Sequence, residues 1–467
     1  MSVRFAWPLA VLACIECLMV FAVLCASALA VGQFEGSQFA GGQFDGSRAL
    51  AASQAMRFAF ICLLVTAMMF ALGLYTWHAA RSYGDLVLRI LAAFATAYLL
   101  YGATVYAVAD LAVAPPVLYA ALLLAVPAMI GLRVGFLRLS EQARLKSRVV
   151  VLGAGNQAAR IRDLENRGAA SRFISTAFVD MADEPAVVAA DRVCELPEDL
   201  VGFARAQDAD EIVIAVKDRR GRLPVQALVR ARLAGLRVSD YQNFAERVLG
   251  RVDLDSLQPN WFLSGEGFRS GRLHRVLKRA FDIAVSFALL VFTLPLLVLT
   301  ALAIKLESRG PVFYRQERVG LNGHGFMLLK FRSMTVDAEA NGAPQWAAVG
   351  DNRVTRVGAV IRKLRIDEIP QAINVLVGEM SFVGPRPERP HFVQMLTHEM
   401  PFYAERHSVK PGITGWAQIN YPYGASVADA KQKLQYDLYY IKNFSIVFDL
   451  AIVLQTVRVV LWSAGAR

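Results

Sequence analysis

The sequence predicts a membrane protein of three parts. These are an α-helical N-terminal bundle, a small Rossmann-like α/β domain, and a mainly α (α+β) C-terminal domain with a re-entrant membrane helix. Apolar stretches fill the first 135 residues, a buried-strand pattern running into a glycine turn begins near Ser147, and a later apolar stretch has positive charge on both sides. Hydrophobic residues make up 55% of the 467, which favours a chain partly in lipid.

Four apolar stretches form the predicted bundle, which we place at residues 1–138. They cover about residues 7–31, 57–77, 85–108 and 113–135. Each is long enough to span a bilayer as a helix. The first is too long for a signal peptide, and no convincing small-residue cleavage site follows it, so we expect an anchor. The Gly/Gln/Phe-rich loop at 32–47 is assigned no chemistry.

Positive charge flanks these stretches in a way that predicts their orientation. The residues concerned are Arg4, Arg81, Arg133, Arg138, Arg144, Lys146 and Arg148. The positive-inside rule places all of them in the cytoplasm. Arg48 and Arg57 are mild exceptions, because they lie in or beside the first outside loop.

Residues 147–250 read as a parallel α/β domain. The segment "RVVVLGAG" has the pattern of a buried strand that runs into a glycine turn, and "FISTAFVD" and "DEIVIAV" are two more strand-like runs. The turn Gly153-x-Gly155-x-x-Ala158 is a weakened dinucleotide fingerprint, and Asp180 lies at roughly the distance of a ribose-binding acid. A lone motif of this kind is weak, so both a nucleotide site and a purely structural or regulatory domain stay open.

After a linker at 251–272, an apolar stretch runs from Ile283 to Ile304. Basic residues lie on both sides of it, which argues that both ends face the cytoplasm. Pro295, near its middle, removes a backbone hydrogen bond and kinks a helix. We therefore predict a helix–break–helix at about 281–304 that dips into the membrane and returns. The alternative is a kinked crossing helix, which would place everything after it outside the cell.

The C-terminal third mixes arginine and lysine with rigid Gly/Pro turns, which suits a polyanionic ligand such as a diphosphate. Interleaved aromatic residues and nucleic-acid motifs are not evident, so we expect no nucleic-acid partner. Two adjacent acids, Asp367 and Glu368, fall between two helical patterns, where Asp is a preferred N-cap. Neighbours at a helix start point about 100° apart. One carboxylate could attack phosphorus while the other holds Mg²⁺, although a capping Asp and a solvated Glu remain the simpler alternative.

Several segments, in order, resemble the bacterial sugar transferase family, the monotopic phosphoglycosyl transferases. The resemblance covers about residues 273–467. The segments are "KRAFDIAVSFALLVFTLPLLVL", "GPVFYRQERVG", "LLKFRSM", "IRKLRIDEIPQAINVLVGEMSFVGPRPE", "VKPGITGWAQIN" and "YDLYYIKN". With four spans and an α/β domain in front, the chain is similar to the large polyprenyl-phosphate hexose-1-phosphate transferases, and its last segments resemble exopolysaccharide-associated members.

The resemblance implies an activity: transfer of a hexose-1-phosphate from a UDP-sugar to undecaprenyl phosphate, with release of UMP, as the first membrane step of exopolysaccharide or O-antigen synthesis. It implies that Asp367 is the nucleophile and that Glu368 binds Mg²⁺. The basic residues it assigns to phosphate and nucleotide are Lys330, Arg362, Arg386 and, more weakly, Arg318. It also implies a homodimer in the bacterial inner membrane, with a cytoplasmic catalytic domain at 273–467.

The chain departs from the family pattern at two positions. Many members carry Ser-Pro at the helix break, whereas this chain has Leu294-Pro295, which leaves the local hydrogen bonding open. Arg365 stands where many relatives have Thr or Ser, and it could contact phosphate or pair with Glu368 at i+3. The final apolar segment, from Phe444, predicts an amphipathic helix on the membrane surface, with a core helix as the alternative.

Two other functions compete with this interpretation. A membrane-anchored nucleotide-sugar dehydratase or epimerase would need a Tyr-x-x-x-Lys pair, and none of the tyrosines has a lysine four residues later. A non-catalytic scaffold for polysaccharide assembly could be built from the same domains.

Overall fold

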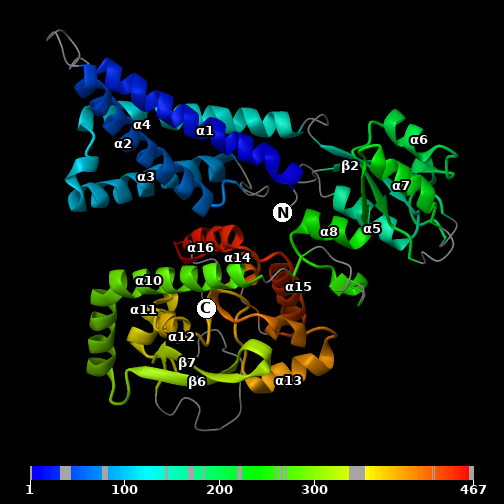
Figure 1. The fold of residues 1–467 in the computed structure, drawn as a ribbon. Coiled ribbons are helices and arrows are strands. Elements are labelled where there is room, and N and C mark those ends of the chain that lie inside the picture. Colours follow the sequence, from blue (N-terminus) through cyan, green and yellow to red (C-terminus); the bar gives the residue numbers. More distant parts are fainter. Residues whose placement is uncertain are drawn as a thin grey trace. The chain divides into compact units, whose positions relative to one another are not determined.

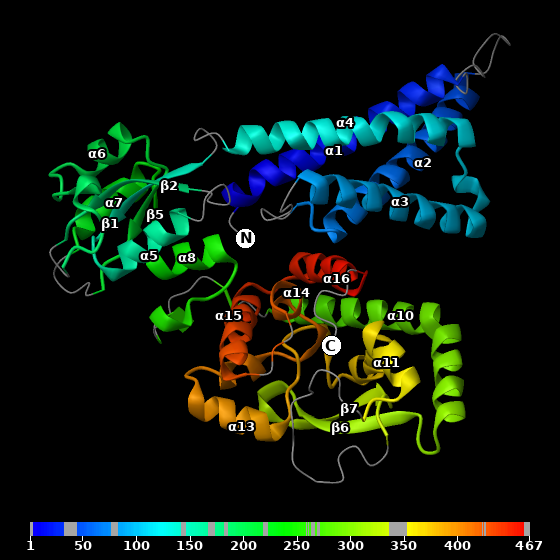
Figure 2. The same cartoon turned by 180° about the vertical axis from the view of Figure 1, so that it is seen from behind.

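The computed structural model describes residues 3–31, 44–75, 83–141, 146–166, 173–181, 185–217, 223–257, 259, 261–262, 267–268, 271–335, 353–422, 424 and 426–461. Most of the 32–47 loop, Arg81 and Arg144 lie outside these ranges, and so does the side chain of Arg4. The chain divides into two compact units, 1–249 and 250–467 (Figures 1 and 2).

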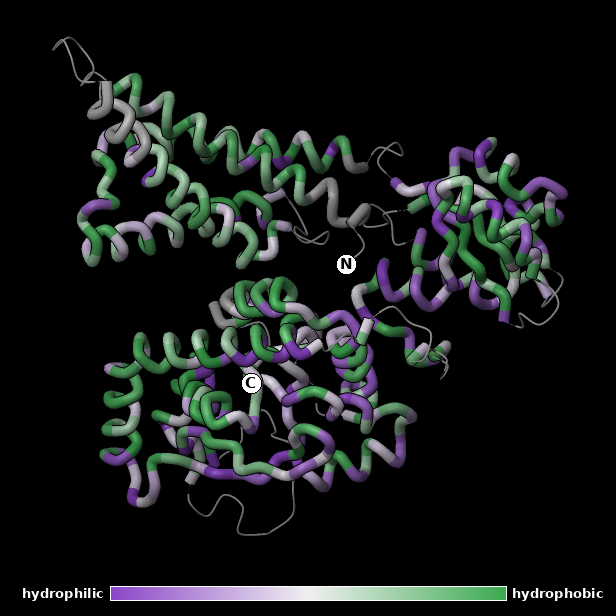
Figure 3. Tube along the Cα trace, viewed as in Figure 1, coloured by the Kyte–Doolittle hydropathy of each residue, from purple (hydrophilic) through white to green (hydrophobic). Residues whose placement is uncertain are grey.

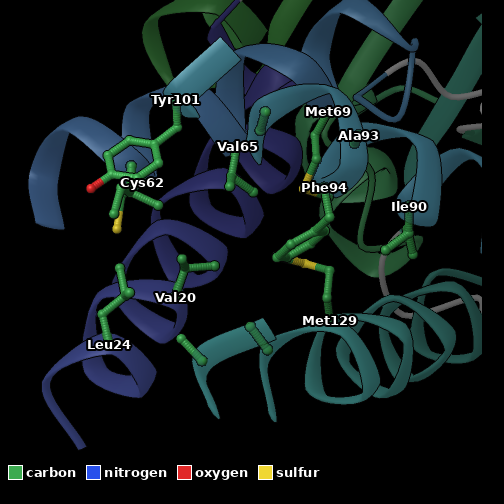
Figure 4. Close-up of a cluster of buried hydrophobic side chains, with 14 of the residues drawn as sticks. Val20, Leu24, Cys62, Val65, Met69, Ile90, Ala93, Phe94, Tyr101 and Met129 are labelled. Carbon is green, nitrogen blue, oxygen red and sulfur yellow. The ribbon is translucent and has the colours of Figure 1, made fainter. Parts of the chain in front are cut away.

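The four predicted apolar stretches form four long helices, which confirms the helical N-terminal region. They are α1 (Val3–Ala30), α2 (Phe44–Ala71), α3 (Tyr83–Ala107) and α4 (Pro115–Glu141), with a short 3₁₀ turn, η2 (Ala109–Leu111), before α4. Each contains a segment long and apolar enough to cross a membrane. Their inner faces share one apolar core, in which Phe94 and Met129 turn toward each other (Figure 4). Outward side chains are also apolar, as at Leu99, which is 74% exposed and suited to lipid.

A buried ion pair ties α1 to α4. Arg133 contacts the carboxylate of Glu16, with Nη2 2.9 Å from Oε2, and Tyr75 donates its hydroxyl proton to the same oxygen at 2.5 Å. The Arg133 guanidinium also lies 4.6 Å from the centre of the Tyr75 ring. Arg133 is therefore a partner of Glu16 inside the bundle, and its place on the cytoplasmic side stays a prediction. Paired charges of this kind are the form in which ionisable residues are tolerated at membrane depth.

The second part of the first unit is an all-parallel α/β sheet, which confirms the predicted parallel sheet. Its strands are β1 (Ser147–Leu152), β2 (Phe173–Val179), β3 (Val193–Cys194), β4 (Glu211–Ile214) and β5 (Arg237–Asp240), in the order β3-β2-β1-β4-β5. Its helices are α5 (Asn156–Glu165), α6 (Leu200–Ala206), α7 (Val225–Leu233) and α8 (Tyr241–Leu249), with a short η5 (Ala190–Arg192) before β3. Alternate residues of β1 point to opposite faces. Val149 and Val151 pack with α5 and α8, whereas Val150 and Leu152 pack with α6 and α7.

Close packing explains why a glycine is needed in the turn after β1. Gly153 has φ +120°, and a Cβ there would lie 2.5 Å from the carbonyl oxygen of Ala215. The amide of Val187 donates to the carbonyl of Ala154 at 2.8 Å, so a later segment covers the turn. Asp180 directly follows β2, and its amide donates to the Cys194 carbonyl. The nucleotide site at Gly153, Gly155 and Asp180 stays a prediction.

The second unit is mainly helical, with two small sheets. Its elements are η6 (Leu254–Ser256), α10 (Arg272–Glu307), β6 (Phe313–Val319), η7 (Leu321–Gly323), β7 (Gly325–Phe331), α11 (Arg356–Lys363), η8 (Ile366–Glu368), α12 (Gln371–Val377), β8 (Ser381–Val383), α13 (Pro390–Glu399), η9 (Ala404–Ser408), β9 (Gly412–Thr414), α14 (Trp416–Asn420), α15 (Val427–Asn443) and α16 (Ile446–Leu461). Strands β6 and β7 form an antiparallel hairpin, and β8 pairs in parallel with β9.

Helix α10 is bent, and both of its ends pack on the same unit. Its ribbon turns sharply in both views, and Pro295 lies inside the helix (Figures 1 and 2). Near the start, Arg279 donates to the carbonyls of Val375 and Leu376. Near the end, Ile304 joins an apolar cluster with Phe331. A straight helix of 36 residues would be about 54 Å long, so the bend is what brings both ends to one body.

The surface of α10 is strongly apolar (Figure 3). Phe292 is 84% exposed, and the helix is long and apolar enough to cross a membrane. At the break, Thr293 donates its hydroxyl proton to the Leu289 carbonyl at 2.6 Å. A hydroxyl therefore binds the backbone beside Leu294-Pro295 although the family's serine is missing.

Helix α16 presents two different faces. Asp449 and Ile452 are fully buried, and Asp449 accepts a hydrogen bond from Tyr440 and pairs with Lys278 of α10 at 2.7 Å. Val447 is exposed. The inner face is thus a core face, as the alternative interpretation of this helix predicted, and membrane contact of the outer face stays a prediction.

Candidate active site

The two adjacent acids lie in a short turn between α11 and α12. Arg365 has φ 58° and ψ 18°, a left-handed conformation that ends α11, and η8 (Ile366–Glu368) follows at once. Left-handed residues at a helix end are usually Gly or Asn, so an arginine here is held by its surroundings. Helix α12 begins only at Gln371, so the expectation that Asp367 caps it was wrong. Asp367 and Glu368 are each 8% exposed.

Three cations surround the Glu368 carboxylate. Arg386 Nη2 lies 2.6 Å from Oε1 and Nη1 lies 3.3 Å from Oε2, which makes a two-point contact. Lys330 Nζ of β7 lies 3.4 Å from Oε1, and Arg365 Nη1 lies 3.7 Å from it. Contacts between ionised groups are shorter and stronger than neutral ones, and bidentate arginine pairs add geometric precision.

The two acids differ in electrostatic state. Burial and the neighbouring Glu368 charge raise the pKa of Asp367 to about 6, although Lys330, Arg386 and Arg365 oppose the rise. Burial also opposes ionisation of Glu368, but Arg386, Lys330 and Arg365 outweigh it and hold its pKa well below the usual range. Adjacent carboxyl groups whose pKa values are pushed apart are suited to different roles.

The buried Asp367 carboxylate differs from that of Glu368 in its contacts. Among the residues that the structure describes, none makes a hydrogen bond or ion pair to this carboxylate, whereas its neighbour Glu368 has three cationic partners. At neutral pH a carboxyl group with a pKa near 6 is mostly ionised and more basic than an ordinary aspartate. Asp367 is therefore the acid of the pair that can act as a nucleophile.

The structure brings together four of the residues predicted for the site, namely Asp367, Glu368, Lys330 and Arg386. Arg365 pairs with Glu368, as one of the two alternatives for this residue predicted. Within the described residues, no contact joins the side chain of Arg362 to either acid, so its role in substrate binding stays a prediction.

Arg318 bonds to protein groups of the neighbouring hairpin and turn. Its Nη1 donates to the carbonyl of Pro387 at 3.0 Å, and its Nη2 donates to Gln316 at 2.6 Å. Sequence reasoning missed Arg406 and Asp437, which form a buried ion pair. They lie on η9 and α15, and no spacing pattern links residues 406 and 437.

A cavity of about 260 Å³ opens beside the acidic turn. Its charged side includes Arg365, Glu368 and Arg386, and its apolar side includes Leu289 of α10 and Val459 of α16. A ligand with a phosphate next to an apolar chain matches this change from charged to apolar lining.

A metal ion could be held here only with help from a substrate. Among the described residues there is no cluster of three or more His, Cys, Asp or Glu side chains. Mg²⁺ often takes one or two carboxylates and completes its shell with water and substrate phosphates. Glu368, which lines the cavity, fits that donor set once Arg386 and Lys330 turn to phosphate oxygens.

These features define an α+β domain with one helix long and apolar enough to cross a membrane and a buried acidic pair beside three cations. Residues 273–463 match the family model described as bacterial sugar transferase. The segment also aligns, at 44% identity over 191 residues, with an exopolysaccharide production protein of Rhizobium leguminosarum bv. phaseoli, covering 39% of this chain and 94% of that protein. The chain belongs to the bacterial sugar transferase family.

Two longer relatives carry more specific names. A UDP-N-acetylgalactosamine-undecaprenyl-phosphate N-acetylgalactosaminephosphotransferase of Aeromonas hydrophila is 46% identical over 240 residues, which cover 51% of this chain and 56% of that protein. An undecaprenyl-phosphate glucose phosphotransferase of Komagataeibacter xylinus is 48% identical over 194 residues, 40% of this chain and 36% of that protein. The matched region thus spans about half or less of these two relatives.

Proposed function

We propose that the protein transfers a hexose-1-phosphate from a UDP-sugar to undecaprenyl phosphate and releases UMP, as the first membrane step of exopolysaccharide or O-antigen repeat-unit synthesis. The observation that carries the proposal is the acidic turn, where a buried Asp367 carboxylate with a raised pKa adjoins Glu368 and its three cations. The printed names of the relatives agree with this reaction but differ in the sugar. UDP-glucose and UDP-galactose are the first donors to test.

The proposed chemistry has two displacements at one phosphorus atom. A carboxylate oxygen of Asp367 attacks the phosphorus that carries the sugar, the bond from that phosphorus to the bridging oxygen breaks, and UMP leaves with the electron pair. A phosphate oxygen of undecaprenyl phosphate then attacks the same phosphorus and displaces the Asp367 carboxylate. No proton transfer to a strongly basic leaving group is required, because UMP leaves as a phosphate anion.

The cations supply the remaining electrostatics. Arg386 lines the cavity and could turn from Glu368 to make a two-point contact with phosphate oxygens there, and Lys330, on the same Glu368 oxygen, would add positive charge. Glu368 would hold Mg²⁺ together with the diphosphate, and the bound ion would neutralise developing charge on the phosphates. Arg318 and Arg362 would act at longer range or on the nucleotide.

The proposal includes a membrane arrangement. The bent α10 would dip into the inner membrane and return, with the catalytic domain in the cytoplasm. Support comes from the packing of both α10 ends on one unit and from the apolar surface between them. The exposed face of α16 would rest on the membrane. Cysteines placed just after Ile304 should be labelled from the cytoplasm, and labelling only from outside would refute the dip.

Two further expectations complete the proposal. The strand order of the α/β domain agrees with a Rossmann-like fold, and its ligand is left open. A homodimer is expected from relatives of this architecture, and the mass of the protein in detergent would test it.

The reaction is tested by incubating membranes that contain the protein with Mg²⁺, undecaprenyl phosphate and a panel of UDP-sugars that includes UDP-N-acetylgalactosamine. UMP release that depends on both the acceptor and one sugar supports the proposal. Release that persists in Asp367→Asn would remove the nucleophile, and no UMP with any sugar would leave the assembly scaffold as the better hypothesis.

A further inference from the structure

The turn that carries Arg386 is held at each of four successive carbonyl groups. Gly412 donates its amide proton to the carbonyl of Pro385 at 2.9 Å, and Val319 donates to that of Glu388 at 3.0 Å. Two arginine side chains donate hydrogen bonds to the two middle carbonyl groups. Arg406 Nη2 donates to the carbonyl of Arg386 at 2.9 Å, and Arg318 Nη1 donates to that of Pro387 at 3.0 Å.

Arg406 uses its side-chain donors on protein groups. Nε and Nη2 reach one Asp437 oxygen at 3.2 and 2.9 Å, Nη1 donates to the Tyr403 hydroxyl at 2.9 Å, and Nη2 also reaches the Arg386 carbonyl. Arg406 is 6% exposed and Asp437 is 2% exposed, so the charges of the pair are largely removed from water. A buried guanidinium with its donors occupied is suited to holding backbone in place rather than to gripping a substrate.

The two neighbouring prolines make such a clamp effective. Pro385 and Pro387 fix their own φ angles, which leaves few ways for the turn to relax. Gly384 adds a close approach, because a Cβ there would lie 2.4 Å from the Lys410 carbonyl oxygen. A turn bound on both sides can therefore present the Arg386 guanidinium to Glu368 at one distance.

We propose that Arg406, neutralised by Asp437, and Arg318 are positioning residues that clamp the Pro385–Glu388 turn and so place Arg386 on Glu368 and the transferring phosphate. This proposal rests on the proposed function for its catalytic consequence, and it reassigns Arg318 from substrate contact to the clamp. Arg406 acts through Arg386 and touches no reacting atom.

The decisive experiment measures the effect of Arg406→Lys alone and again in a protein that also carries Arg386→Lys. Lysine keeps the charge but cannot serve Asp437, Tyr403 and the Arg386 carbonyl together. In the full-length protein, kcat for UMP release should fall about tenfold or more while KM for the UDP-sugar changes less than about threefold. In the Arg386→Lys background, Arg406→Lys should cost less than about threefold, because residues that act as a unit are not additive.

Hydrogen exchange reports on the clamp without any turnover. The amides of residues 382–384, 386 and 388 should exchange faster in Arg406→Lys than in the unaltered protein, because one side of the turn is released. Arg332→Lys is the matched control: this buried arginine donates to the carbonyls of Ser308 and Arg309, away from the turn. It should leave exchange in the turn unchanged.

Two results would overturn the clamp. One is unchanged exchange over 382–388 in Arg406→Lys. The other is a double variant whose loss of kcat equals the product of the losses in Arg406→Lys and Arg386→Lys. Such a product is expected when the two effects are independent or global, because independent free energies add. If the unaltered protein releases no UMP, the proposed function fails, and the exchange comparison still decides the clamp.

Discussion

Arg386 and Glu368 face each other in a two-point contact, with Nη2 to Oε1 at 2.6 Å and Nη1 to Oε2 at 3.3 Å. The contact joins the rigid turn after β8 to the acidic turn before α12. It keeps Glu368 ionised although that carboxyl is buried. Under the proposed function the same guanidinium would move to a phosphate when a substrate arrives, which would link substrate entry to the release of Glu368.

Replacing Arg386 by lysine tests the two-point contact separately from the positive charge. In Arg386→Lys a positive charge remains, but the second contact to Glu368 is lost. We expect kcat/KM for UMP release to fall by about ten- to a hundredfold, the range for weakening one preorganised donor. Arg309→Lys, on an exposed side chain, is the control and should be within about twofold of the unaltered protein. Equal activity of the two variants would show that the two-point contact of Arg386 is dispensable.

The pH dependence of kcat/KM should report the raised pKa of Asp367. The nucleophile must be ionised, so activity should be full well above pH 6 and fall as the pH drops through about 6. An ordinary aspartate would place this fall near pH 4. Initial rates of UMP release from pH 4.5 to 8 measure it, with folding at each pH checked by circular dichroism. A plateau that extends down to pH 4.5 would contradict the electrostatic account.

The bundle pair gives a stability prediction. Glu16→Gln leaves the buried guanidinium of Arg133 without a counter-ion, and breaking a buried pair costs about 3–5 kcal/mol. Thermal unfolding in detergent should move to clearly lower temperature. Cys14→Ala, on an exposed position of the same helix, should change little. Replacing both partners, as Glu16→Leu with Arg133→Met, should restore most of the loss, and a double variant as unstable as the single one would refute a pairing role.

The glycine turn of the α/β domain gives a second stability prediction. Gly153→Ala adds a methyl group 2.5 Å from the Ala215 carbonyl oxygen at a residue with φ +120°, so it should destabilise the domain by several times the cost of backbone strain alone, which is about 1 kcal/mol. Gly235→Ala is the control, since it has φ +89° but open space around its Cβ position. Proteolysis of the domain should be much faster for Gly153→Ala than for Gly235→Ala. Similar rates would show that the close approach is relaxed cheaply.

The sequence predicts features whose physical signal is local. Apolar runs of membrane length mark the four N-terminal helices, and the continuous apolar run Val149–Leu152 marks a strand buried on both faces. The pairing of Arg365 with Glu368 follows from i+3 spacing, and Lys330 and Arg386 were expected beside the acids from the family resemblance.

Long-range pairs and unusual backbone carry no such signal. Glu16 and Arg133 are 117 residues apart, and only the packing of α1 against α4 brings them together. Nothing in the sequence around Arg365 indicates its left-handed conformation, which ends α11 and starts the acidic turn, and Asp367 lies in that turn rather than at the Pro370 cap of α12. The meeting of Arg406 with Asp437 depends on the folded path of the chain between η9 and α15.

The central claim, a phosphosugar carried on Asp367, is tested most directly by the mass of the intact protein. The purified protein is incubated with Mg²⁺ and a UDP-sugar that supports UMP release, without undecaprenyl phosphate, and quenched. The account predicts a mass increase of one hexose-phosphate group on the unaltered protein, with an equal amount of UMP, and its loss on adding undecaprenyl phosphate. Asp367→Asn should gain no mass. Turnover with no mass increase, or the same increase in Asp367→Asn, would contradict the account.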